Sequence, residues 1–406
     1  MNNSLLSKPL SISAYFILLL IMTEFLGWRY IGPLSCRNIA VIITIVMLLF
    51  SGNLSFKRVE KQAWLLFIYY CFILLLGFIN DLYVLIPDFP LTRVFPCVVI
   101  YLFIVSFVND KRSFRMIVYS LLIIGALDAV VSILQGLGNN LGWLIGAAFI
   151  DPNQLEVADE GVGAISEYHT FGLVGTTVSN GYFLATTGLL SLYLLMRSKK
   201  LYTKLLSLVL VAVFVTALFY NQQRAAFYVF CSIVSMSLLY ILIFTKSLLQ
   251  KYFILLSLLV LIITILRYDF FPTDIGRLSN ITADDIELRH LRHHEFYREF
   301  MPNNLFLGNR TGYILQYGQT PHNMVIETLL LGGVFGLLLY ALFVVSICKE
   351  FINNIIKKHS EAVLFCFPII VLLLISWEHS SGYHTAMSLG IYYLGLFDSL
   401  RRINKQ

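Results

Sequence analysis

The chain of 406 residues carries little charge: Asp, Glu, Lys and Arg make up 13% of it, whereas 58% of its residues are hydrophobic. A soluble core of this size does not need so much apolar surface, so the composition indicates a polytopic membrane protein. The six cysteines include no CxxC pair and imply neither a disulfide framework nor a thiolate metal site. The first apolar run has only Lys8 ahead of it and lacks a small-residue cleavage signature, so we expect a retained span and no removable signal peptide.

Long apolar runs are what the chain has in abundance. A helix needs about 20 apolar residues to cross the hydrocarbon, and roughly twelve such runs are present. All are expected to be helical, because lipid cannot satisfy a bare backbone. The sequence therefore predicts an all-α fold, with one transmembrane domain over residues 1–406, in which Pro96 breaks the fourth span. The expected spans are 11–28, 38–54, 63–80, 93–109, 114–135, 181–197, 203–221, 225–245, 250–267, 323–347, 361–377 and 383–399.

Lysine is missing from one side of this topology. Lys and Arg collect on cytoplasmic loops, and with both termini inside all thirteen lysines fall on inner loops or their margins. The net charge of +6 is then a topology signal and no indication of nucleic-acid binding. Arginine without lysine on the outer side favours the planar fork that grips phosphate or carboxylate. The arginines of the outer loops and turns are Arg224, Arg277, Arg289, Arg292, Arg298 and Arg310. Four more outer arginines lie at span ends, where anchoring at the interface is the plainer interpretation: Arg29, Arg37, Arg93 and Arg267.

The first large outer loop covers 136–180 and is acidic in its middle and rich in glycine. Its apolar segment 141–150 is too short to span the membrane, so we expect it to lie in the interface. The glycine-punctuated stretch 171–181 leads into the next helix, where Ser179 or Asn180 is the expected N-cap. For Asn180, a contact with substrate is the alternative.

The second large outer loop covers 268–322 and is expected to carry the active site, since long loops in compact proteins are usually functional. A capping-box pattern at 282–285 predicts a helix that stops at 302–304. On this helix Arg289 and Arg292 lie on one side, three residues apart. A polar cleft beside them is the expected consequence.

Histidines next to these arginines raise the question of a metal. His290, His293, His294 and Glu295 have spacings that share a helix face, but they match no zinc signature. A cationic solvated face is the plainer interpretation, and a phosphate-binding role lies between the two. We expect no metal.

His322 is the sharper candidate, because it follows Pro321 at the mouth of a predicted helix with Asn323 beside it. Histidine accepts a proton from a hydroxyl near neutral pH. Glu327 lies inside the same apolar run, where an ionisable residue is a functional hypothesis by default, although a structural hydrogen bond is the alternative. The GxxxG at 332–336 indicates close helix packing.

Arg224 sits in a very tight outer turn between two spans, after three polar residues. An arginine at a span end can simply snorkel to the interface. Four polar residues in so short a turn favour a further role.

Taken in order, these features resemble the O-antigen polymerase (Wzy-type) and O-antigen ligase superfamily over roughly residues 165–345. The resemblance rests on Arg224 in a short outer turn, Arg289 ahead of the Leu-Phe-x-Gly turn at 305–308, His322-Asn323, Glu327, and the glycines 332, 333 and 336.

The resemblance implies a GT-C-like, multi-pass glycosyltransferase of the bacterial inner membrane with a periplasmic site and no cofactor. Its substrates would be glycans on undecaprenyl diphosphate in the membrane lipid, and a chain-length-regulating membrane protein is an implied partner. Arg224 and Arg289 would hold the diphosphate, and His322 would orient or deprotonate the acceptor hydroxyl; Arg292 is an alternative to Arg289. The candidates for substrate binding are Arg292, Asn323, Glu327, Asn180 and Arg310.

Two acceptors are compatible with the resemblance. A polymerase joins lipid-linked repeat units, and a ligase passes the finished chain to lipid A-core; aromatic-rich loops favour the polymerase. A flippase or transporter would carry paired charges in mid-span and inverted repeats, and the sequence offers no convincing repeat. A scaffold protein would leave the arginine-only outer set unexplained.

Overall fold

A computed structural model of the chain describes residues 9–27, 29–52, 54–81, 94–149, 170–198, 200–244, 296–317, 323–357 and 383–405, with a few single positions between them. Within these residues the protein is built from thirteen α-helices, with one two-stranded hairpin. The prediction of an all-α fold is therefore confirmed.

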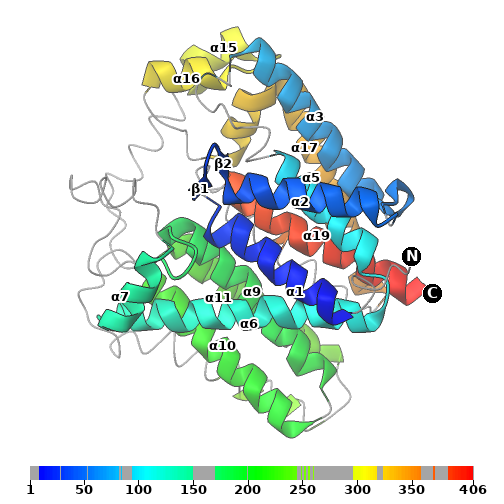
Figure 1. Ribbon diagram of the computed structural model, residues 1–406, viewed down its shortest axis with the longest axis vertical. Helices are drawn as coiled ribbons and strands as arrows, with labels where there is room; N and C mark the ends of the chain where they lie inside the picture. The colour runs from blue at the N-terminus through cyan, green and yellow to red at the C-terminus, as the bar shows by residue number, and fades with distance from the viewer. Residues whose placement is uncertain are drawn as a thin grey trace.

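The helices before the first large loop alternate in direction (Figure 1). They are α1 (Pro9–Leu20), continued by the π-helical turn η1 (Ile21–Phe25), α2 (Cys36–Phe50), the 3-10 turn η2 (Phe56–Arg58), α3 (Lys61–Ile79), α5 (Phe95–Phe107), α6 (Lys111–Gly136) and α7 (Asn140–Ala147). The hairpin strands β1 (Tyr30–Ile31) and β2 (Leu34–Ser35) lie between α1 and α2.

The helices after that loop complete the bundle. They are α9 (Thr177–Arg197), α10 (Leu201–Asn221), α11 (Arg224–Phe244), the π-helical turn η5 (Phe296–Phe300), α15 (Met301–Asn304), α16 (Arg310–Tyr317), α17 (Met324–Ile356) and α19 (Tyr383–Lys405).

Five of the described helices are long and apolar enough to cross a membrane: α3, α6, α9 over Thr177–Leu195, α10 and α17. Shorter apolar helices occupy four more of the expected spans, at Ser11–Phe25, Cys36–Phe50, Phe95–Phe107 and Ala226–Leu239. The expected spans 250–267 and 361–377 lie largely outside the described residues. The fold is therefore that of a multi-pass protein with at least five helices of spanning length.

The helices pack in three groups (Figure 1). Helices α6, α9, α10 and α11 pack on one another, α3 packs along α17, and α5 lies between these groups against α2 and α19. Almost every side chain of α5 is buried, which matches a helix that is apolar on all sides. Pro96 does not break this span as expected. It lies in the first turn of α5, where a missing N–H leaves no hydrogen bond unmade.

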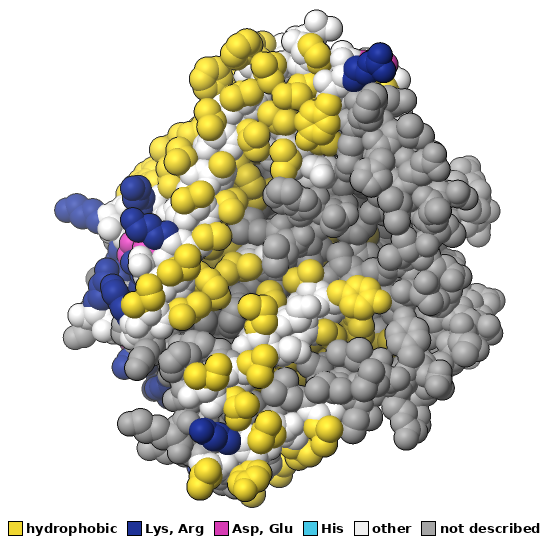
Figure 2. Space-filling model, turned by 180° about the vertical axis from the view of Figure 1, so that it is seen from behind, with side chains coloured by type: hydrophobic (Ala, Val, Ile, Leu, Met, Phe, Trp, Pro, Cys, Tyr) yellow, Lys and Arg dark blue, Asp and Glu magenta, His cyan; other side chains and the backbone are white. Residues whose placement is uncertain are grey.

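Basic side chains gather at one end of the bundle. Figure 2 shows Lys and Arg along one edge of the molecule, beside a broad hydrophobic band. Helices α3, α6 and α10 begin near a lysine, at Lys61, Lys111 and Lys204, and α19 ends at Lys405. The start of α1 and the end of α19 lie at this same end (Figure 1). We call it the lysine-bearing end and call the other the opposite end.

Candidate functional site

Predicted site residues meet where helix α17 begins, at the opposite end of the bundle. The helix begins after Asn323, whose Oδ1 accepts hydrogen bonds from the backbone N–H groups of Val325 (2.9 Å) and Ile326 (3.1 Å). Asn323 is thus the N-cap, which satisfies two backbone donors that the helix itself leaves free. Its carbonyl accepts from the N–H of Glu327 at 2.8 Å. His322, the residue before the cap, lies outside the described residues.

Helix α17 is broken one-third of the way along. Gly333 has φ 57° and ψ −159°, a conformation that essentially only glycine adopts. The expected span 323–347 is therefore a short helical segment, 324–332, followed by a longer one, 334–356. The N–H of Val334 donates to the carbonyl of Leu305 at 2.9 Å. A turn from outside the helix thus satisfies the backbone at the break, as a buried discontinuity requires.

The turn 305–308 and the break fit together through two glycines. A Cβ added at Gly333 would lie 2.0 Å from the carbonyl oxygen of Phe306, and one added at Gly308 would lie 2.4 Å from that of Leu330. Gly308 also has positive φ, at 69°. Asn80 at the end of α3 donates to the Gly308 carbonyl at 3.0 Å. The turn and the broken helix therefore form one interlocked unit.

The GxxxG interpretation of 332–336 predicted close helix packing, and both glycines face the neighbouring helix α3, along which α17 packs. A Cβ added at Gly332 would lie 3.5 Å from Ile73, and one added at Gly336 would lie 3.7 Å from Phe72, which is ordinary contact. Gly333, between them, is the position that cannot accept a side chain, because it approaches the turn 305–308.

Arg310 and Glu327 form a buried ion pair at this unit. The Nε of Arg310 donates to Oε1 of Glu327 at 2.5 Å, and the side chains are 9% and 1% exposed. Arg310 begins α16, two residues after Gly308. Glu327 lies on the short segment of α17, one turn beyond its cap. The sequence singled out both residues separately, and the fold brings them together.

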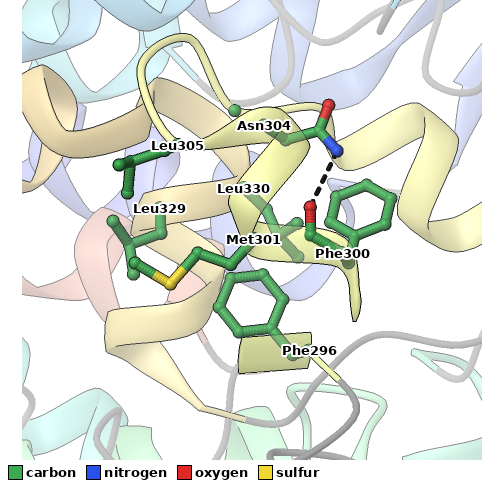
Figure 3. A pocket seen from close by; sticks show the side chains of 8 residues that line it. Phe296, Phe300, Met301, Asn304, Leu305, Leu329 and Leu330 are labelled. Carbon is green, nitrogen blue, oxygen red and sulfur yellow. Dashed lines mark hydrogen bonds between the residues drawn. The ribbon is translucent and has the colours of Figure 1, made fainter. Parts of the chain in front are cut away.

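An aromatic cluster covers the next turn of α16. Tyr313 lies one turn beyond Arg310, and its ring is 5.3 Å from that of Phe300 and 4.7 Å from that of Tyr317. Beside this cluster is a narrow crevice that is too small to hold a water molecule. Figure 3 shows Phe296 and Phe300 on one side of it and Leu329 and Leu330 of α17 on the other.

Asn180, the candidate from the first outer loop, lies elsewhere, in a buried polar cluster at the opposite end of α6 and α9. It is fully buried, and its amide donates to Oδ2 of Asp128 at 2.7 Å and accepts from Ser132 at 3.0 Å. Oδ1 of Asp128 accepts from the N–H of Leu173 at 2.6 Å. The N-cap of α9 is Thr176, so the prediction of Ser179 or Asn180 as the cap was wrong. The helix begins one turn earlier than its apolar run.

The segment 170–173 is held by side chains from two helices. Gln135 accepts from the N–H groups of Phe171 (3.1 Å) and Gly172 (3.0 Å). Asn221, at the end of α10, donates to the carbonyls of Thr170 (2.7 Å) and Thr177 (3.0 Å). A loop buried between helices carries polar backbone groups that must be satisfied. These side chains satisfy them.

Asn221 also connects this cluster to the turn that precedes Arg224. The turn is as tight as predicted, with Gln222 in the left-handed conformation at φ 57°. Arg224 starts α11, and its side chain is not among those the structure describes. The backbone of the Arg224 turn is therefore fixed against the start of α9.

Several predicted residues lie outside the described part of the chain. They are His322, Arg289, Arg292, His290, His293, His294 and Glu295. Among the residues that the structure does describe, no group of histidine, cysteine and carboxylate side chains could hold a metal.

The sequence interpretation passed over two residues that organise this end of the protein, Asp128 and Gln135. Both are polar residues within an apolar span, a signal that marks a role by default. The sequence interpretation noted the turns that contain Gly308 and Asn221, but what these two residues contact depends on which segments meet in three dimensions.

Comparison with models of known protein families finds no match to the chain, and no curated protein matches it in sequence.

Proposed function

We propose that the chain is a membrane-embedded glycosyltransferase that joins undecaprenyl-diphosphate-linked oligosaccharide repeat units at the periplasmic face of a bacterial inner membrane, as an O-antigen polymerase does. The observation that carries the proposal is the broken helix α17. Its cap, Asn323, follows the residue predicted to be catalytic, His322, in the sequence, and its short segment carries one partner of the buried Arg310–Glu327 pair. Irregular backbone at membrane depth is tolerated where protein buries it or where it lines a cavity, and in transporters such broken helices build substrate sites.

The proposed reaction is a displacement at an anomeric carbon. The acceptor sugar hydroxyl forms the new C–O bond while the bond from the anomeric carbon to the lipid diphosphate breaks. His322 takes the hydroxyl proton. Arg224 and Arg289, or Arg292 in place of Arg289, hold the diphosphate. Preset cations stabilise the negative charge that develops on the leaving group. The reaction requires no cofactor or metal.

The proposed topology has twelve spans with both termini in the cytoplasm. It is supported by the lysine-bearing end, where α1 starts and α19 ends (Figure 1), because lysine marks the cytoplasmic side. The active site then lies at the opposite end, where Arg310 and Asn323 are found. The lipid-linked substrates enter from the surrounding membrane lipid, and a chain-length-regulating membrane protein is the expected partner.

Deletion of the gene in its host, followed by separation of the lipopolysaccharide on a gel, tests the proposal. If the protein is a polymerase, its deletion leaves core that bears a single repeat. Wild-type protein supplied to the deletion strain then restores the ladder, whereas His322→Ala does not. Core that bears no repeat would instead indicate the ligase, which passes the finished chain to lipid A-core. An unchanged ladder would remove both and favour the flippase or transporter class.

A further inference from the structure

Arg310 differs from an unpaired outer arginine because its positive charge is balanced by the carboxylate of Glu327. Both side chains are more than nine-tenths buried and in contact at 2.5 Å. A guanidinium so close to a carboxylate forms a neutral unit, because their opposite charges attract strongly where water is excluded. Arg310 is therefore not a free cation of the kind that a diphosphate needs.

The pair leaves hydrogen-bonding groups unused. Oε2 of Glu327 is buried and has no hydrogen-bond partner. Arg310 uses only its Nε, so the four N–H groups on Nη1 and Nη2 make no hydrogen bond to any residue in the described part of the chain. A buried polar atom without a partner is rare and calls for a ligand group or an ordered water.

This combination selects the chemistry of what it can bind. A hydroxyl accepts a hydrogen bond from a guanidinium N–H and donates one to a carboxylate oxygen, so it satisfies both unused edges at once. A phosphate would gain from Arg310, but its negative charge would face the Glu327 carboxylate. Like charges in a buried site oppose binding. The site therefore favours a neutral hydroxyl over an anion.

Aromatic side chains lie close to the pair. Tyr313, one turn beyond Arg310 on α16, packs against Tyr317 of the same helix and against Phe300 of η5. Ligand sites are typically lined by apolar and aromatic side chains with a few fixed polar groups. The interlock of Gly308 with Gly333 holds Arg310 and Glu327 in place. Such rigidity lowers the entropy cost of binding.

We propose that Arg310 and Glu327 together form a subsite for a sugar hydroxyl of the glycan substrate and do not contact its diphosphate. The inference rests on the proposed function, and it separates Arg310 from Arg224 and Arg289. The ion pair binds the acceptor repeat unit through one hydroxyl, which donates to Glu327 Oε2 and accepts from an Arg310 Nη group.

The test uses the full-length protein in lipid nanodiscs, with lipid-linked repeat units extracted from the deletion host as substrate. The apolar double variant Arg310→Met/Glu327→Leu removes the polar edge without leaving an unpaired buried charge. Replacing a buried ion pair by apolar residues is often neutral for stability. We expect its thermal unfolding to stay near wild type while KM for the repeat units rises about tenfold to a hundredfold. Glu299→Gln, which changes an exposed carboxylate on η5, is the matched control and should leave KM unchanged.

Inorganic pyrophosphate, added as a competing probe, separates hydroxyl from diphosphate recognition. Glu327→Gln uncovers the charge of Arg310, so pyrophosphate should inhibit this variant more strongly than wild type. The double variant should be inhibited as strongly as wild type.

Two results would overturn the inference while leaving the enzyme class intact. One is a double variant that folds and keeps the wild-type KM, measured where the wild-type protein transfers glycan normally. The other is loss of pyrophosphate inhibition in the double variant. Absence of glycan transfer by the wild-type protein would instead count against the proposed function itself.

Discussion

Replacing Gly333 with alanine tests the interlocked unit directly. The added Cβ would lie 2.0 Å from the carbonyl oxygen of Phe306 and 2.7 Å from the nitrogen of Leu307. Alanine in this backbone conformation costs roughly 1–3 kcal/mol. If the turn moves away, the hydrogen bond from Val334 to Leu305 is lost, at about 1 kcal/mol. We expect the free energy of unfolding to fall by roughly 2–4 kcal/mol in Gly333→Ala.

Thermal unfolding of the purified protein in detergent measures this effect. The same loss should lower the melting temperature by roughly 2–5 °C and abolish glycan transfer, because the turn positions Arg310 and the break positions the start of α17. Gly332→Ala is the matched control. It lies one residue away on the same helix, and its added Cβ would be 3.5 Å from Ile73, so it should melt and work like wild type. Equal melting temperatures and activities in the two variants would refute the reasoning.

Three further variants test other parts of the structure. Gly308→Ala should destabilise the protein like Gly333→Ala, because its Cβ would lie 2.4 Å from a carbonyl oxygen of α17; normal melting would contradict this. Asp128→Leu leaves the N–H of Leu173 and the Asn180 amide without their acceptor, so we expect a loss on the order of 2–4 kcal/mol in detergent unfolding, and a loss below about 1 kcal/mol would count against a structural role. Asp110→Ala removes the N-cap of α6 and should cost about 1 kcal/mol at neutral pH. Partial burial raises the pKa of the Asp110 carboxyl. Hydrogen bonds from the first turn of α6 lower this pKa by a larger amount, so the net pKa is below the usual value. The cap's contribution should therefore be complete above about pH 4 and disappear as the pH falls through the folded pKa, and a variant difference that grows in acid would contradict this.

The helices could be predicted because apolar runs mark the segments that cross lipid, where the backbone must form all of its hydrogen bonds within the segment. Runs such as 63–80 and 203–221 gave α3 and α10 with bounds within two residues. The errors occur where polar residues are buried. Helix α9 begins at Thr177, four residues before its expected start, because Asn180 has partners inside the protein. Hydropathy alone treats such a residue as part of a loop.

The helix break at Gly333 could not be read from the sequence. A glycine in an apolar run is equally compatible with close packing, a kink or no role at all. What decides is the turn 305–308, which reaches Gly333 from outside the helix. The pairing of Arg310 with Glu327 was hidden for the same reason.

The arginine pattern was informative only as a set. An excess of arginine over lysine marks a need for planar donors, but two outer arginines use those donors on the protein itself. Arg37 donates to the carbonyl of Thr23 at 2.7 Å, and Arg310 donates to Glu327. Composition shows that such donors are needed, and only the fold shows what each one contacts. Arg224, Arg289 and Arg292 stay predictions.

The most direct test of the account is glycan transfer by the purified protein. Wild-type protein in nanodiscs is mixed with lipid-linked repeat units from the deletion host, and the products are separated by size. The account predicts a ladder of lipid-linked oligomers from wild type and only single repeats from His322→Ala that is folded to the same melting temperature. Single repeats alone from folded wild-type protein, or an undiminished ladder from His322→Ala, would contradict it.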